Sequence, residues 1–171
     1  MRVIIQKVSR GSVSVKGQVF SSIESGYVLL VGLGKLDDES DLIWMTQRIL
    51  SLKLWPCLKD LFWKRSIREI PEANILSISQ FTLLATINKG TKPDFHNAMT
   101  GSLSKPLYHK FLNLLRQDLG HHRIFDGVFG EMMEVELVNQ GPVSTVNNSF
   151  PSFFRSIRTI RNLSFSPSRS Q

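Results

Sequence analysis

Residues 74–85, with the sequence NILSISQFTLLA, decide the fold of this chain. Ile75, Leu76 and Ile78 form a short apolar run, which predicts a buried strand. We expect this central strand to extend from Asn74 to Ala85. Its second half then presents small polar side chains and backbone N–H groups at the edge of a rigid element. Residues placed in that way are suited to hold a bound ligand.

The sequence on either side predicts more strands and two long helices. Apolar residues at helical spacing follow two caps: Asp37 or Asp38 caps the first helix, and Ser104 caps the second. Pro106 lies in the first turn of the second helix and Gly120 ends it. Apolar or alternating segments predict strands at 2–8, 12–20 with a hairpin turn at Lys16-Gly17, 27–32, 52–55 and 133–138.

Two intervening segments carry no regular pattern. Residues 56–73 are predicted to form a loop or hairpin excursion, and residues 86–100 are polar and rich in turn residues. Strands therefore outnumber helices along the chain. The expected fold class is α/β: a single domain with a barrel-like or sandwich-like sheet and two long helices.

The totals describe an ordinary globular protein. The chain has 171 residues, of which 42% are hydrophobic and 20% are charged. Cys57 is the single cysteine, which excludes an internal disulfide and agrees with a reducing compartment. The first residues do not form a signal peptide, and no apolar run approaches the roughly 20 residues that span a bilayer. We expect a cytoplasmic protein with no membrane partner.

The charge is unevenly distributed along the chain. The formal net charge is +7, yet every acidic residue lies before position 137. Such a balance is compatible with a polyanionic partner but does not demand one. Residues 147–171 contain seven serines, two prolines and four arginines. We therefore expect a domain at 1–146 and a divergent, disordered tail at 147–171, in which Phe150, Phe153 and Phe154 leave room for a short docked piece.

The chain has no self-sufficient catalytic motif. It lacks HExxH, paired cysteines, GxSxG and a phosphate-binding loop. His121 and His122 are adjacent, and adjacent histidines rarely share one metal ion. We expect neither a metal nor a cofactor. An enzyme built this way acts by positioning and by backbone electrostatics, which suffices for an activated ester but not for an ordinary amide.

Several short motifs occur together and in a fixed order: SQFTL at 79–83, KGTKPDFH at 89–96, DGVFG at 126–130 and NQGPV at 139–143. In this order they resemble the D-aminoacyl-tRNA deacylases, which remove D-amino acids from mischarged tRNA. The resemblance covers nearly all of residues 1–144. Each motif alone is weak, because SQFTL is more often a strand end and a Gly-Pro peptide is usually trans.

The resemblance implies a homodimer that binds the aminoacylated 3′ end of tRNA. It implies hydrolysis of D-aminoacyl esters such as D-Tyr-tRNA, and of Gly mischarged on tRNA-Ala. A cis Gly141-Pro142 peptide would reach into the partner's pocket and exclude L-residues. The implied catalytic residues are Ser79, Gln80, Phe81 and Thr82, and the implied substrate-binding residues are Lys92, Pro93, Phe95, His96, Phe129, Met133 and Asn139.

Two questions stay open at this level. Thr82 is a possible nucleophile, but no base lies near it in sequence, and attack by water assisted by the 2′-hydroxyl of tRNA is the favoured alternative. After Ser144 the sequence leaves the family pattern, so we expect the last strand to be missing beyond Val146. The alternative functions are an inactive tRNA-binding module of the same fold and a structural or unstable splice product.

Overall fold

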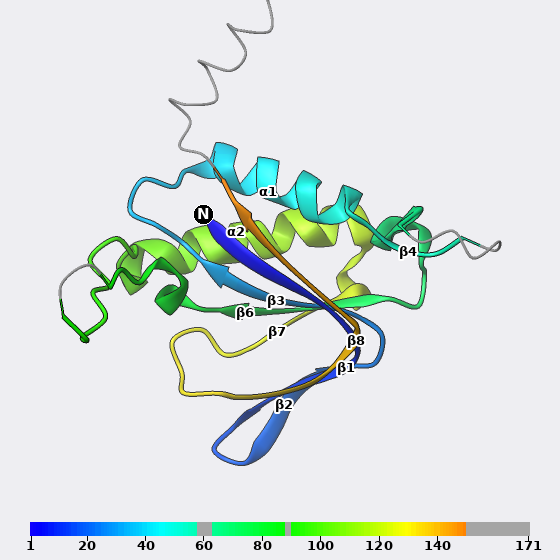
Figure 1. The fold of residues 1–171 in the computed structure, drawn as a ribbon, viewed down its shortest axis with the longest axis horizontal. Coiled ribbons are helices and arrows are strands. Elements are labelled where there is room, and N and C mark those ends of the chain that lie inside the picture. The colour runs from blue at the N-terminus through cyan, green and yellow to red at the C-terminus, as the bar shows by residue number, and fades with distance from the viewer. Residues whose placement is uncertain (58–62, 88–89, 150–171) are drawn as a thin grey trace, which may run out of the picture.

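The computed structural model describes residues 1–57, 63–87 and 90–149 (Figure 1). Predicted features at 58–62, at 88–89 and in the tail from 150 onward lie outside the described residues. The elements in chain order are β1 (Arg2–Val15), β2 (Gln18–Ile23), β3 (Gly26–Gly32), α1 (Glu39–Ser51), β4 (Lys53–Trp55), β5 (Arg65–Ser66), η1 (Ile67–Glu69), β6 (Asn74–Ser79), η2 (Phe81–Leu84), α2 (Gly101–Leu119), η3 (His121–Arg123), β7 (Ile124–Asp126) and β8 (Glu134–Asn148).

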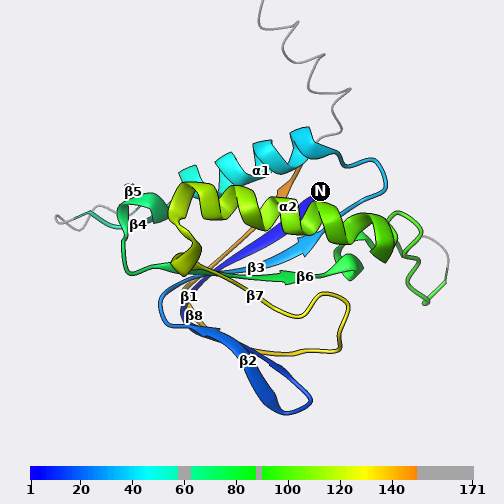
Figure 2. The same cartoon turned by 180° about the vertical axis from the view of Figure 1, so that it is seen from behind.

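A six-stranded, strongly twisted sheet forms the centre of the fold. Its order is β2-β1-β3-β6-β7, and β8 pairs with the other edge of β1. The pairs β3–β6 and β6–β7 are parallel, whereas β1 runs antiparallel to each of its neighbours. Helices α1 and α2 lie together on one face of this sheet (Figure 2). The predicted α/β class with a barrel-like sheet and two long helices is confirmed.

The core has two parts, one on each face of the sheet. The larger cluster lies under the helices and includes Ile5, Leu29 and Phe111. The smaller one, on the opposite face, includes Val28, Leu76 and Ile78. Strand β6 thus supplies buried residues to both faces, as its continuous apolar run predicted. No helix within the described part of the chain is long and apolar enough to cross a membrane.

The central strand is shorter than predicted. Strand β6 ends at Ser79: the backbone N–H of Gln80 makes the last ladder hydrogen bond, to the carbonyl of Val31 at 2.7 Å, and the chain then leaves the sheet. The 3₁₀ turn η2 follows and packs on Gly32, where an added Cβ would lie 2.4 Å from Leu84. This contact is tertiary, so the local pattern over 74–85 could not reveal it.

The start of helix α2 also differs from the prediction. The N-cap is Thr100, whose carbonyl accepts hydrogen bonds from the backbone N–H and the hydroxyl of Ser104. Ser104 is therefore buried inside the helix, and Pro106 lies beyond the first turn. Proline is tolerated there because the carbonyl that it leaves without a donor belongs to Ser102, which is exposed to solvent. The predicted end at Gly120 is confirmed.

Two locally encoded predictions are confirmed. Asp38 caps α1 with its side chain and forms a capping box with Asp41. Lys16 and Gly17 both have positive φ angles, 51° and 76°, which is the geometry of a tight hairpin turn. The predicted strand at 52–55 is present as β4, and the excursion after it contains β5 and η1.

The expectation of a missing last strand is wrong. Strand β8 continues to Asn148, which pairs with Arg2, and it stays in register with β1 over Val143–Asn148. Backbone hydrogen bonds form this ladder, so polar side chains do not prevent it. Two polar side chains of this segment, however, lie on the face of β8 that packs against the core. Thr145 Oγ1 and Asn147 Nδ2 are buried without a hydrogen-bond partner.

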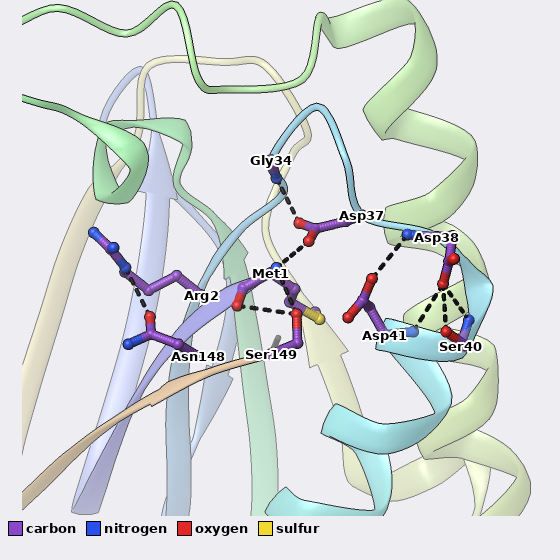
Figure 3. A network of polar contacts seen from close by, with 9 residues as sticks. All are labelled: Met1, Arg2, Gly34, Asp37, Asp38, Ser40, Asp41, Asn148 and Ser149. Carbon is purple, nitrogen blue, oxygen red and sulfur yellow. Dashed lines mark hydrogen bonds and ion pairs between the residues drawn. The ribbon is translucent and has the colours of Figure 1, made fainter. Parts of the chain in front are cut away.

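The end of β8 is tied to the loop that leads into α1 (Figure 3). The α-amino group of Met1 donates to Ser149 Oγ at 2.6 Å and forms an ion pair with Asp37. The same carboxylate accepts the backbone N–H of Gly34 at 2.6 Å. The N–H of Ser149 donates back to the carbonyl of Met1 at 2.8 Å. These contacts connect β8 and β1 to the loop that follows β3.

Candidate active site

A cavity of about 790 Å³ opens at the carboxyl ends of the parallel strands β3 and β6. Val31 and Leu33 line it from the β3 side, and Ile78 and Ser79 from the β6 side. Ligands of α/β sheets commonly bind at this end of parallel strands. The remaining walls come from η2, the segment 95–104, helix α2 and the loop between β7 and β8.

More than half of the predicted site residues meet in this cavity. The four residues with an expected catalytic role lie on one wall, in the turn that follows β6. Three residues with an expected substrate-binding role lie on the others. The predicted residues that line the cavity are Ser79, Gln80, Phe81, Thr82, Phe95, Phe129 and Met133.

The turn after β6 is built to present backbone donors. Its N-cap, Gln80, makes no side-chain capping bond. The amide of Gln80 donates to Thr82 Oγ1 at 2.5 Å instead. The first N–H groups of a helical turn have no acceptor within that turn, so those of Phe81 and Thr82 are available to an oxygen atom in the cavity. Such a pair of donors can polarise a carbonyl group.

The floor of the cavity is held rigidly. The hydroxyl of Tyr108 donates to Ser77 Oγ at 3.0 Å, and both residues are buried. The carbonyl of Ser77 accepts the backbone N–H of Gly127, which leads into the loop that carries Phe129. The rings of Tyr108 and Phe129 pack with their centroids 5.5 Å apart. Burial raises the pKa of the Tyr108 phenol well above its ordinary value.

Two aromatic rings mark the mouth of the cavity. Phe81 from η2 and Phe95 from the following loop meet edge to face, with centroids 5.2 Å apart and planes at 71°. Phe81 is 57% exposed and Phe95 is 36% exposed. An antiparallel bridge between Thr86 and Asp94 holds the loop that presents Phe95.

The remaining predicted residues lie outside the cavity. Lys92 and Pro93 are exposed on the loop before Phe95. His96 is also exposed, and its ring Nδ1 lies 2.5 Å from Asp94 Oδ2. Hydrogen bonds from the backbone N–H and the ring of His96 hold the pKa of the Asp94 carboxyl below its usual value.

The Gly-Pro segment bulges out of β8. Asn139 pairs with Val8 and Val143 pairs with Lys7, so the residues between them have no partner on β1. The Gly141-Pro142 peptide is cis, as the resemblance implies. Both residues and Asn139 are exposed, and none of them lines the cavity of their own chain. Within one chain the bulge therefore forms no part of the cavity wall.

Sequence reasoning missed several lining residues. Tyr108 received no role, and Ser104 was assigned to a cap. Glu131 follows DGVFG directly and is the single acidic residue among the described residues that line the cavity. Its position next to that motif was the available signal. The described residues contain no cluster of His, Cys, Asp or Glu that could hold a metal ion.

Comparison with known proteins identifies the family. The model of the family "D-Tyr-tRNA(Tyr) deacylase" matches residues 4–148, which include all of β8. A D-aminoacyl-tRNA deacylase of Eremothecium gossypii is 47% identical over 146 residues, 85% of this chain and 97% of that protein. One of Saccharomyces cerevisiae is 46% identical over 149 residues, 87% of this chain and 99% of that protein.

Solved structures agree with this result. A structure named c-Myc DNA Unwinding Element Binding Protein has a TM-score of 0.83 and 36% identity, and the match covers 87% of this chain and 99% of that one. A structure described as a probable eukaryotic D-amino acid tRNA deacylase has a TM-score of 0.75 at 20% identity, over 85% and 97% of the two chains, and supports the fold. The predicted relationship is confirmed: this chain belongs to the D-Tyr-tRNA(Tyr) deacylase family.

Proposed function

We propose that this protein hydrolyses the ester bond of D-aminoacyl-tRNA and releases the free D-amino acid and the tRNA. Glycine mischarged on tRNA-Ala is a second substrate, because glycine has no side chain for a chiral gate to exclude. The observation that carries the proposal is the cavity into which Ser79, Gln80, Phe81 and Thr82 all project. The curated relatives carry this activity in their names and match nearly their whole length.

In the proposed mechanism the enzyme positions an ester that is already activated. The backbone N–H groups of Phe81 and Thr82 donate to the ester carbonyl and stabilise the negative charge that develops on it. A water molecule attacks the carbonyl carbon, assisted by the neighbouring 2′-hydroxyl of the terminal ribose. The ester C–O bond then breaks, and the leaving 3′-oxygen of the tRNA takes up a proton. Gln80 and Ser79 orient the reacting groups.

The terminal adenosine would occupy the apolar side of the cavity. Phe129 and Met133 line this side, and aromatic and thioether side chains suit the flat face of a base. Lys92, Pro93 and His96 lie on the exposed loop beside the mouth, where cationic groups can meet tRNA phosphates. Asn139 would support the bulge of the Gly-Pro segment.

The chiral gate would act between two subunits. Gly141 and Pro142 are exposed and do not line their own cavity, so a second copy of the chain is needed for them to reach one. We propose a homodimer in which each bulge enters the partner's cavity and occupies the place of an L-side chain. The two-fold symmetry of a homodimer serves both sites at once.

The alternative of an inactive tRNA-binding module loses its main argument. That argument was a missing last strand, and β8 pairs with β1 up to Asn148. The bulge that holds Gly141 and Pro142 is therefore supported by ladder pairs on both sides. These pairs support the proposal that the segment acts as a gate.

The test compares hydrolysis of D-Tyr-tRNA and L-Tyr-tRNA by the full-length protein and by a Gly141→Ala, Pro142→Ala double variant. We expect the wild type to hydrolyse the D-ester and to spare the L-ester. The variant should lose this discrimination. A folded protein that binds D-Tyr-tRNA without turnover would instead identify the inactive binding module.

A further inference from the structure

The two rings at the mouth of the cavity are not explained by the proposed chemistry. Polarisation of the ester uses the backbone N–H of Phe81 and leaves its side chain without a role. That side chain is 57% exposed, and its main aromatic contact is the ring of Phe95. Neither residue belongs to the two buried core clusters. Two adjacent apolar rings that line a cavity and are partly exposed are suited to contact a bound molecule.

Two cationic residues contact the segments that carry this aromatic pair. Lys35 lies close enough to Asp94 to affect its carboxyl, and the backbone N–H of Lys35 donates to Asn97 in the loop that carries Phe95. On the other side, the guanidinium of Arg2 donates to the carbonyl of Leu83 in the turn that carries Phe81 at 2.5 Å. Lys35, in the loop after β3, and Arg2, on β1, thus contact the two segments that present the rings.

Exposed aromatic rings between cationic side chains are the usual surface for single-stranded nucleic acid. Bases stack on the rings, and the charges follow the phosphate backbone. The substrate of the proposed reaction supplies such a strand, because the 3′ end of every tRNA is an unpaired CCA sequence. If the terminal adenosine fills the cavity, the preceding nucleotide must leave through the mouth, where the two rings lie.

We propose that the side chains of Phe81 and Phe95 form a stacking platform for the base of the penultimate nucleotide of the tRNA. This inference rests on the proposed function and adds a second nucleotide site to it. The platform fixes the direction in which the strand leaves the cavity, and thereby the position of the ester above the N–H groups of Phe81 and Thr82. Stacking does not depend on base identity, which suits an enzyme that acts on many tRNAs.

The first experiment measures how much the second and third nucleotides improve the substrate. D-Tyr esterified to adenosine alone is compared with D-Tyr esterified to the trinucleotide CCA. One stacked base commonly improves binding by about tenfold or more. We therefore expect the KM of the wild type to be about tenfold lower for the trinucleotide, and this ratio to approach one in Phe95→Leu and in Phe81→Leu.

Leucine is chosen because it keeps the position apolar and removes only the aromatic face. In Phe81→Leu the backbone N–H remains, so polarisation of the ester is retained. The matched control is Phe20→Leu on β2, since Phe20 is also 57% exposed but does not line the cavity. We expect the control to keep the ratio of the wild type.

The second experiment needs no catalysis. A trinucleotide with 2-aminopurine at the penultimate position carries D-Tyr through a stable amide at its 3′ end. Stacking on an aromatic ring quenches the fluorescence of 2-aminopurine. We expect quenching with the wild type and with Phe20→Leu, and little or none with either platform variant.

The outcomes separate the two proposals. Failure of the wild type to hydrolyse either ester contradicts the proposed function. If the wild type hydrolyses both esters with nearly equal KM values, the proposed platform is overturned and the proposed function is retained. The platform is also overturned if Phe95→Leu and Phe81→Leu raise both KM values equally, or if quenching persists in them.

Discussion

The hydroxyl of Thr82 is the residue-scale feature that bears most directly on mechanism. It accepts a hydrogen bond from the neutral amide of Gln80, and an amide cannot remove its proton. No carboxylate or imidazole is bonded to it among the described contacts. The geometry therefore favours an orienting role over a covalent one.

We expect Thr82→Ala to retain most of the deacylase activity. Removal of an orienting hydrogen bond of about 1 kcal/mol lowers kcat/KM by about fivefold. The measurement is single-turnover hydrolysis of D-Tyr-tRNA, with Thr82→Ser as the control that keeps the hydroxyl. A loss of about 10⁴-fold or more in Thr82→Ala, with Thr82→Ser active, would restore the covalent mechanism.

The phenol of Tyr108 predicts a dependence of stability on alkaline pH. Burial raises its pKa above the ordinary value of 10.0, so above that pH the folded protein holds a proton that the unfolded chain has lost. The stabilising contribution of Tyr108 is therefore complete below pH 10 and is lost as the pH rises further.

We expect Tyr108→Phe to be less stable than the wild type at pH 7.5 by about 1 kcal/mol, because Ser77 loses its buried donor. The difference should shrink above pH 10 and then reverse. Urea unfolding of both proteins between pH 7.5 and 11 tests this. Tyr27 and Lys7, whose pKa values burial also shifts, are present in both proteins and cancel in the difference. A constant difference across this range would contradict the assignment.

At the scale of the element, β8 keeps its backbone pairing although polar side chains lie on its inner face. Asn147 lies opposite Val3 and Thr145 lies opposite Ile5, and both neighbours are fully buried. Asn147 Nδ2 and Thr145 Oγ1 therefore face an apolar cluster without partners. Each such atom costs free energy of folding, because it has lost water without gaining a hydrogen bond.

We expect Asn147→Leu to stabilise the protein by about 1 to 2 kcal/mol, since a side chain of similar size replaces the unpaired amide. The free energy of unfolding in urea is the quantity to measure. The control is Ser144→Val, a polar-to-apolar change on the exposed face of the same strand, which should change stability by less than about 0.5 kcal/mol. Equal effects of the two substitutions would show that apolar content alone matters.

The elements also show what the sequence could predict. Asp38 and the Lys16-Gly17 turn were predictable because their hydrogen bonds and φ angles depend on a few neighbouring residues. The end of β6 at Ser79 was not, because it depends on the close approach of η2 to Gly32 of β3. The continuation of β8 to Asn148 was not predictable either. Its last residues are mostly polar, and the strand is held by backbone hydrogen bonds to β1 that the side-chain pattern does not reveal.

The candidate site was also predictable only where a local motif encodes it. SQFTL and DGVFG were found as motifs, and four residues of the first and two of the second, Phe129 and Gly130, line the cavity. Glu131 and the packing of Tyr108 on Ser77 were missed, because a cavity wall is assembled from segments that no local pattern connects. Gly141 and Pro142 do not line the cavity of their own chain, so the part that the Gly-Pro motif plays in the site stays a prediction.

At the scale of the whole molecule, this last point predicts that the gate of one subunit controls the cavity of the other. The Gly141→Ala, Pro142→Ala variant keeps its cavity and should hydrolyse L-Tyr-tRNA. A second variant, Phe81→Pro with Thr82→Ala, keeps its gate but lacks the backbone N–H of Phe81 that polarises the ester, so its cavity should be slower by about 100-fold or more. When the two are refolded together with the second in large excess, nearly every gate-defective chain pairs with a chain whose gate is intact.

If each bulge enters the partner's cavity, this mixture should lose the hydrolysis of L-Tyr-tRNA and retain that of D-Tyr-tRNA. The working cavity in each mixed dimer then faces an intact gate. If the gate instead acted within its own chain, L-Tyr-tRNA hydrolysis would depend only on the amount of gate-defective chain. Light scattering of the mixture establishes that dimers are present. Rates measured at several mixing ratios then decide between the two arrangements, because suppression that follows the fraction of mixed dimers requires a site made by two chains.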